Sequence, residues 1–203
     1  MSRETDQERI TYPPDPNPRK ASFDVPAGAC DTHVHVFGPP HRFAYASVRN
    51  YTPPAVPVEH LMNMMDIVGL DRAVVVQPSA HGTDNAVTLN ALSVGGGRFR
   101  GVIKVSGAET DAELERMHEA GVRGVRYTFV AALRGKVDLA LADRMGLRIA
   151  PMGWNTVLHM DRAFLTECHD WLDAQTMATV IDHFGRVEIG EGTAQPAFQA
   201  LLR

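Results

Sequence analysis

Cysteine is scarce in this chain of 203 residues, which has only Cys30 and Cys168, far apart in the sequence. They form no CxxC pair and no disulfide framework, which suits a reducing cytosol and predicts a cytoplasmic protein. No run of about 18 apolar residues occurs, so we expect no membrane span and no membrane partner. Neither sign of charge dominates: the net charge is −4 and the pI is near 6.1, which argues against a nucleic-acid partner.

Apolar residues make up 44% of the chain and charged residues 22%, which are values typical of a folded globular protein. Residues 1–28 differ from the rest, because they are polar, rich in proline and without the apolar segment of a secretory signal. Such a segment cannot order itself alone. We expect an N-terminal arm over residues 1–28 that lies on the domain, or on a partner subunit of a homo-oligomer. Residues 29–203 form the expected domain.

Short β-branched runs alternate with amphipathic stretches from residue 29 onward. We expect strands at 30–37, 72–77, 100–106, 122–129, 156–160 and 178–181, and helices at 58–70, 83–92, 110–120, 137–152, 162–174 and 193–202. Strands that alternate with helices in this way are parallel. Residues 30–203 number 174, or 29 for each of six units, whereas a (β/α)8 barrel typically has ~250 residues. The sequence predicts an α/β fold with about six βα units. It is either an incomplete (β/α)8 TIM-like barrel that stops before strands 7 and 8, or a doubly wound open sheet, of which the dinucleotide-binding form is unsupported because the first βα turn lacks GxGxxG.

Two histidines on the first expected strand are the strongest sign of chemistry. His33 and His35 are separated by one residue, so a strand places both on the same face. His159 and His183 come at the ends of the fifth and sixth strands, where parallel α/β folds place their sites. Neutral imidazoles from separate strands can hold a metal ion or stabilise an oxyanion. We interpret the loop and helix histidines as solvated or structural: His41, His60, His118 and His169.

Several segments together resemble the amidohydrolase superfamily, and within it the amidohydrolase-related branch that contains 2-pyrone-4,6-dicarboxylate lactonase. The resemblance runs from about residue 22 to residue 203. It rests on Cys30-Asp-Thr-His-Val-His-Val-Phe-Gly-Pro39, Arg49-Asn-Tyr51-Thr-Pro53, Val76-Gln-Pro-Ser79-Ala-His-Gly-Thr-Asp-Asn85, Gly124-Val-Arg126-Tyr-Thr-Phe129 and Asp182-His183-Phe-Gly-Arg186. It implies a hydrolase that opens a lactone or similar ester of a small carboxylated molecule, such as those of aromatic catabolism.

The resemblance also implies roles for individual residues. His33, His35 and His183 would be catalytic, around the scissile carbonyl and the water. Four residues match substrate-binding positions, with the two arginines suited to carboxylates because a guanidinium pairs with them bidentately: Tyr51, Ser79, Arg126 and Arg186. His81 follows Ser79 and would line the mouth of the site. The cofactor is either none or one divalent metal ion, zinc being the best match, with His33, His35, His159 and His183 as ligands.

Two departures from the family leave alternatives open. The family has an Asp on the eighth strand as the base for the attacking water, whereas here Glu188 and Glu191 lie in the loop after the sixth strand. A second arginine of the pyrone lactonase has Ala132 and Arg134 as its nearest counterparts. The alternatives to a lactone hydrolase are therefore a metal-dependent decarboxylase of the same superfamily, and a truncated, catalytically incompetent domain that serves as a binding or interaction module.

Overall fold

The computed structural model describes residues 9–131 and 137–203, and the chain forms two compact units, residues 1–101 and 102–203. The sequence positions Ala132 and Arg134 lie outside the described residues. Within the described part of the chain, no helix has the length and apolar character needed to cross a membrane. Each unit is described by itself.

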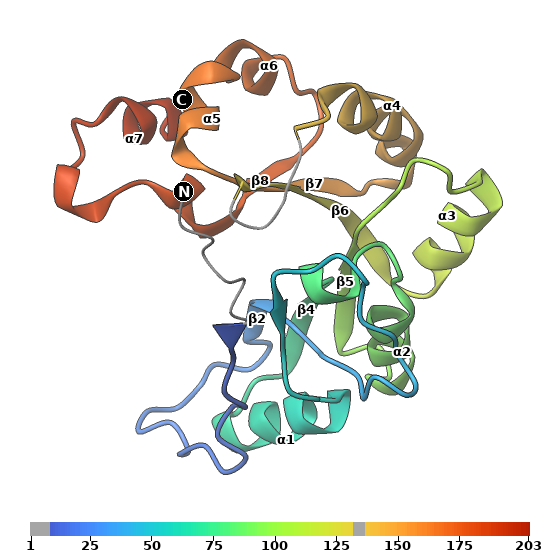
Figure 1. Ribbon diagram of the computed structural model, residues 1–203. Coiled ribbons are helices and arrows are strands. Elements are labelled where there is room, and N and C mark those ends of the chain that lie inside the picture. The colour runs from blue at the N-terminus through green and yellow to red at the C-terminus, as the bar shows by residue number, and fades with distance from the viewer. Residues whose placement is uncertain (1–8, 132–136) are drawn as a thin grey trace, which may run out of the picture. The chain divides into compact units, whose positions relative to one another are not determined.

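In the described part of the first unit, short strands alternate with helices (Figure 1). Its elements are β1 (Arg9–Ile10), β2 (Cys30–Val34), β3 (Tyr51–Thr52), α1 (Val58–Val68), β4 (Arg72–Val76), the 3-10 helix η1 (Ser79–His81) and α2 (Ala86–Val94). Strand β5 (Phe99–Ile103) begins in this unit and ends in the second. β2 and β4 are parallel, with Cys30 opposite Arg72 and Val34 opposite Val75. Leu61 and Met65 of α1 are buried because apolar residues recur at helical spacing along it.

The second unit repeats the alternation of strand and helix. Its elements are α3 (Asp111–Glu119), β6 (Val122–Phe129), α4 (Leu139–Ile149), η3 (Ala150–Met152), β7 (Asn155–Met160), α5 (Arg162–Glu167), α6 (His169–Asp173), β8 (Thr179–Ile181), η4 (Asp182–Arg186), η5 (Ile189–Glu191) and α7 (Pro196–Leu201). β6 pairs with β7 and β7 with β8, all parallel (Figure 1). One sheet of six strands contains β2, β4, β5, β6, β7 and β8. The predicted α/β fold, with about six strand–helix units of an incomplete barrel, is confirmed.

Alternation along β6 decides which side chains meet the helices and which can serve a site. Phe129 stacks on Phe164 of α5 with ring centroids 5.1 Å apart, so the odd-numbered residues of β6 face the helices. Val125 is buried on this same side. Because successive strand residues point to opposite faces, Arg126 and Thr128 point the other way. The site therefore has to be built from the even-numbered residues of this strand.

One expectation about local structure is wrong. The expected helix over 162–174 is broken at Cys168, whose φ of −114° and ψ of 25° separate α5 from α6. Tertiary contacts outweigh helix propensity there, since Trp171 donates a hydrogen bond to Asp143 and its ring meets Phe164 edge-on. The arm of residues 1–28 was expected to lie on the domain or on a partner subunit. Among its described residues, Arg9 pairs with Tyr51 and Ile10 with Thr52, as the parallel strands β1 and β3.

Candidate active site

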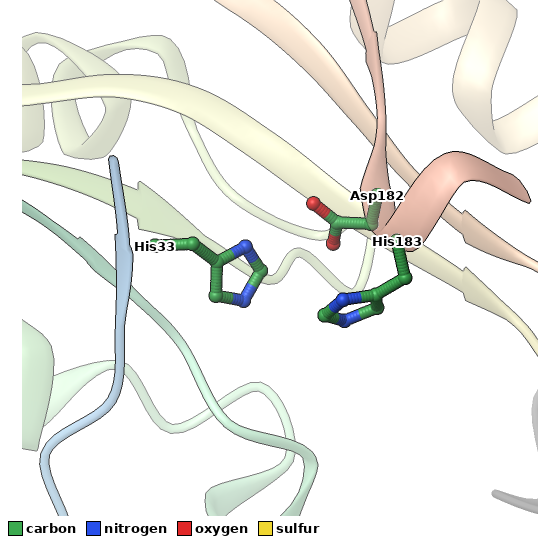
Figure 2. Close-up of side chains that lie close together, drawn as sticks. All are labelled: His33, Asp182 and His183. Atoms are coloured by element: carbon green, nitrogen blue, oxygen red, sulfur yellow. The ribbon is translucent and has the colours of Figure 1, made fainter. Parts of the chain in front are cut away.

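His33 and His35 lie next to each other at the end of β2, with ring centroids 5.0 Å apart and planes at 86°. Asp31 braces the strand, because its carboxylate accepts a hydrogen bond from the His33 backbone N–H at 3.1 Å. The Nδ1 atom of His35 lies 2.7 Å from the carbonyl oxygen of Val76. A carbonyl can only accept, so Nδ1 carries a proton, and in the neutral ring Nε2 carries the lone pair that a ligand or a proton needs. Figure 2 shows the His33 ring projecting from β2.

A cavity of about 350 Å³ in the first unit brings two predicted site residues together. His35 and Tyr51 both line it, with Phe37 between them in the sequence. The Phe37 ring meets the Tyr51 ring nearly perpendicularly, at 6.5 Å between centroids. This volume lies within the range of small-molecule sites, ~300–1,000 Å³. Tyr51 is placed by β3, which pairs with β1 in the arm.

Ser79 and His81 begin and end the 3-10 helix η1, which follows β4. The Nδ1 atom of His81 donates to the carbonyl oxygen of Ala44 at 2.9 Å, and its ring stacks on Phe37. Burial lowers the pKa of His81, so the imidazole is neutral. His81 thus ties the loop before β3 to the end of β4. It is a buried bracing residue, whereas the sequence suggested that it lines the mouth of the site.

In the second unit, Arg126 and Asp182 form a buried ion pair. The Nε atom of Arg126 donates to Asp182 at 2.8 Å, and both side chains are only 4% exposed. The pair joins β6 to the end of β8, where the sheet register places Val157 beside Arg126 and Val180 beside Val157. Asp182 was absent from the sequence-based site, although it stands directly before His183. Only the fold shows that it orients the arginine.

His159 and His183 form a second pair of imidazoles in this unit, with ring centroids 5.0 Å apart. Burial, and then the charge of Arg126, lower the pKa of His159 to about 4, so its ring is neutral near pH 7. Its Nδ1 atom is buried without a hydrogen-bond partner among the described residues, as is the hydroxyl of Thr128, its neighbour across β6. A neutral imidazole with an unsatisfied buried nitrogen has the chemistry of a metal ligand. Figure 2 shows Asp182 and His183 together at the end of β8.

The turn that carries His183 is strained. His183, Phe184 and Arg186 have φ values of 54°, 52° and 54°, in the left-handed region that non-glycine residues rarely adopt. Strain of this kind concentrates at functional sites, where the surrounding structure enforces it. Arg186, about half exposed, lies 3.3 Å from Asp161 at the end of β7. The turn therefore holds His183 and Arg186 in fixed positions at the ends of the strands.

Lys104 is a cation that the sequence gave no reason to select. It directly follows β5, at the same end of the strand as the other candidate residues. Burial, and then repulsion by the guanidinium of Arg126, lower the pKa of Lys104 to about 8. The carboxylate of Asp182 pairs with Arg126 in this cluster. Such a cluster favours the arrival of an anionic group.

The structure thus groups the predicted residues in each unit. The first unit brings together His33 with His35, and His35 with Tyr51; the second brings together His159 with His183. Two of the histidines interpreted as structural contact side chains outside the candidate site. Trp154 donates a hydrogen bond to His118, and His169 lies 3.4 Å from Asp173.

Parallel strands with histidines, an arginine and a carboxylate at their carboxyl ends define a class of α/β proteins with the ingredients of hydrolytic chemistry. The sequence profile of the amidohydrolase family matches residues 30–203, and the chain belongs to this family. The predicted resemblance is therefore confirmed.

Two curated relatives and one solved structure are similar to this chain. A 2-pyrone-4,6-dicarboxylate hydrolase from Comamonas testosteroni is 40% identical over 92% of this chain and 61% of its own length. A 4-sulfomuconolactone hydrolase from Hydrogenophaga intermedia is 38% identical over 89% of this chain and 60% of its own. A probable 2-pyrone-4,6-dicarboxylic acid hydrolase from Acinetobacter baumannii, solved with citric acid bound, has 28% identity and a TM-score of 0.76 over 86% of this chain and 65% of its own. The chain spans about 60% of the length of the curated relatives.

Proposed function

We propose that this chain takes part in the hydrolysis of a small carboxylated lactone. The observation that carries the proposal is the cavity that brings His35 and Tyr51 together, in a chain 40% identical to a hydrolase of 2-pyrone-4,6-dicarboxylate. The family resemblance implies a role in the site for both residues. A cytoplasmic location, and a small carboxylated molecule as the partner, belong to the same proposal.

Recognition of the substrate would depend on its carboxylate groups. Arg126 uses Nε to bind Asp182, so the carboxylate of Asp182 fixes the plane of the guanidinium. The terminal amino groups of Arg126 can then pair with a substrate carboxylate in a fixed direction. Lys104 adds a second positive charge beside Arg126. Arg186 is half exposed and held by Asp161, which suits a contact with the far end of the substrate.

In the reaction, a water oxygen bonds to the lactone carbonyl carbon, the ring C–O bond breaks, and the leaving oxygen takes up a proton. His33, His35 and His183 would polarise the carbonyl and orient the water, since imidazole nitrogens can donate or accept hydrogen bonds. The His35 ring is suited to this because the carbonyl of Val76 fixes its tautomer. Arg126 would hold the substrate while its carbonyl is attacked.

The histidine pairs also fit a divalent metal ion. His33 with His35, and His159 with His183, each place two rings 5.0 Å apart, and the buried Nδ1 of His159 has no hydrogen-bond partner among the described residues. We therefore include one divalent ion, zinc by its preference for imidazole, as the proposed cofactor. When bound, such an ion would act as a Lewis acid on the carbonyl oxygen.

The test measures the hydrolysis of 2-pyrone-4,6-dicarboxylate, with and without added zinc. The loss of ultraviolet absorbance of the substrate reports the rate. We expect His35→Asn to reduce kcat by ~10²-fold or more. His169→Asn is the matched control, because His169 lies on α6 beside Asp173 and carries no proposed role. Equal rates for both variants would contradict the role of His35. An absence of turnover in every condition would overturn the hydrolytic part of the proposal, and binding of the substrate is measured separately.

A further inference from the structure

Two cavities in the first unit meet at His35. The cavity of about 350 Å³ and a second one of about 250 Å³ share the lining residues Pro14, His35 and Val56. Pro14 belongs to the N-terminal arm, so one arm residue borders both cavities. Thr11 and Tyr12 extend this border along the larger cavity. The arm thus forms a wall next to a residue with a proposed catalytic role.

The arm is held in this position by the backbone as well as by side chains. Arg9 and Ile10 form the parallel pair with β3. The hydroxyl of Thr11 donates to the carbonyl oxygen of Thr52 at 3.3 Å, and the side-chain amide of Asn63 donates to that of Pro16 at 3.1 Å. Proline fixes φ, so a segment with prolines at 13, 14, 16 and 18 loses little entropy on docking. The wall is therefore built into the fold.

This wall lies outside the segment that the family profile matches, which begins at residue 30. Tyr12 and Pro14 contribute ring surfaces to the cavity, which Phe37 and Tyr51 also line. The Tyr12 side chain is 87% exposed, so a ligand that covers it removes aromatic surface from water. Flat aromatic surfaces pack best against a flat partner.

We propose that Thr11–Pro14 form the outer wall of the lactone-binding cavity, and that Tyr12 and Pro14 select planar, conjugated lactone rings over saturated, puckered ones. This specificity rests on the proposed function, because it assigns the occupant of the cavity to the lactones. A planar ring offers a whole flat face to the Tyr12 and Pro14 rings. A puckered ring with the same heavy atoms offers fewer atoms to a flat surface.

The test compares two lactams, which are stable isosteres of the lactones: 2-pyridone-4,6-dicarboxylate, which is planar, and 2-piperidone-4,6-dicarboxylate, which is puckered. Their dissociation constants are measured by calorimetry on the full chain. We expect the planar ligand to bind more tightly to the wild type, and Tyr12→Ala to weaken its binding about 3- to 10-fold, the contribution typical of an aromatic contact. The puckered ligand should lose less than about 2-fold by the same reasoning. Tyr12→Phe should preserve the wild-type ratio because it keeps the ring.

The matched control is Phe23→Ala, which removes another exposed aromatic ring of the arm, one that lines neither cavity. As a second measurement, the amide hydrogens of Thr11 and Tyr12 should exchange more slowly when the planar ligand is bound. Equal effects of Tyr12→Ala and Phe23→Ala, or unchanged exchange in the arm, would overturn the assignment of the wall while the ligand still binds. Failure of both lactams to bind the wild type would instead overturn the proposed substrate class.

Discussion

The buried pair of Arg126 and Asp182 allows a stability prediction whose size follows from its burial. Asp182→Asn keeps the side-chain volume but removes the negative charge, so the guanidinium of Arg126 remains buried without its counter-charge. Because both side chains are 4% exposed, water cannot replace the lost partner. Breaking one side of a buried pair costs about 3–5 kcal/mol. A domain is typically stable by only about 5–15 kcal/mol, so the effect should be plain.

The assay is urea unfolding followed by tryptophan fluorescence, since Trp154 and Trp171 both lie in the second unit with this pair. The matched control is Glu191→Gln, which removes the carboxylate from the pair with Arg162, where the side chains are 46% and 49% exposed. Exposed pairs contribute ~0–1 kcal/mol, so the control should unfold nearly like the wild type.

A double variant separates the charge effect from the lost contact. Adding Arg126→Met to Asp182→Asn removes the unpaired cation, and we expect the free energy of unfolding to recover by at least half. The reasoning would be refuted if Asp182→Asn destabilised the chain no more than Glu191→Gln, or if the double variant gave no recovery.

Three further predictions concern single residues of the second unit. Thr110→Ala should lower the free energy of unfolding by about 1 kcal/mol, because Thr110 and Glu113 form a capping box at the start of α3, and an unchanged thermal melt would contradict this. Between pH 8 and 10.5 the folded wild type has lost the proton of Lys104, whose pKa is about 8, while the unfolded chain still holds it, so the free energy of unfolding should rise with pH. Lys104→Met should abolish this rise. The same pH slope in both proteins would refute the prediction. Phe184→Gly should raise the melting temperature slightly. Relief of the left-handed φ contributes about 1–2 kcal/mol, which exceeds the entropy cost of glycine of about 0.5–1 kcal/mol. A clear loss of stability would show that the contacts of the Phe184 ring contribute more than its backbone strain costs.

Strong local signals in the sequence predicted much of the fold. β6 spans Val122–Phe129 as expected, because its β-branched and aromatic residues follow Gly121, which comes directly after the C-cap residue of α3. The helix expected at 110–120 is α3, and the capping box of Thr110 with Glu113 fixes where it begins. The break at Cys168 has no local signal, since helix propensity is similar on both sides and the contacts of Trp171 decide. The pairing of Arg9 with Tyr51 is a long-range contact that no periodicity of the sequence predicts.

Some residues of the candidate site could be predicted from the sequence, and others could not. His33 and His35 follow from strand alternation, and His159 and His183 from their places at strand ends. Lys104 could not be selected from sequence, because a lone lysine after a strand is most often solvated, and its proximity to Arg126 depends on the tertiary fold. Asp182 carries a stronger signal, since it precedes His183 at a strand end and a buried arginine needs a carboxylate.

The most direct test of the account measures how tightly a carboxylated ring binds when the guanidinium group of Arg126 is replaced by another cation. Arg126→Lys retains a cation for Asp182 and loses the bidentate geometry. The dissociation constant of 2-pyridone-4,6-dicarboxylate should rise about 10-fold or more by calorimetry, as expected for a charged hydrogen bond of about 1.5–3 kcal/mol. Binding of the dimethyl ester, which has no carboxylate, should be weak and equal in both proteins. Unchanged affinity for the dicarboxylate in Arg126→Lys would contradict the central claim that Arg126 anchors the substrate.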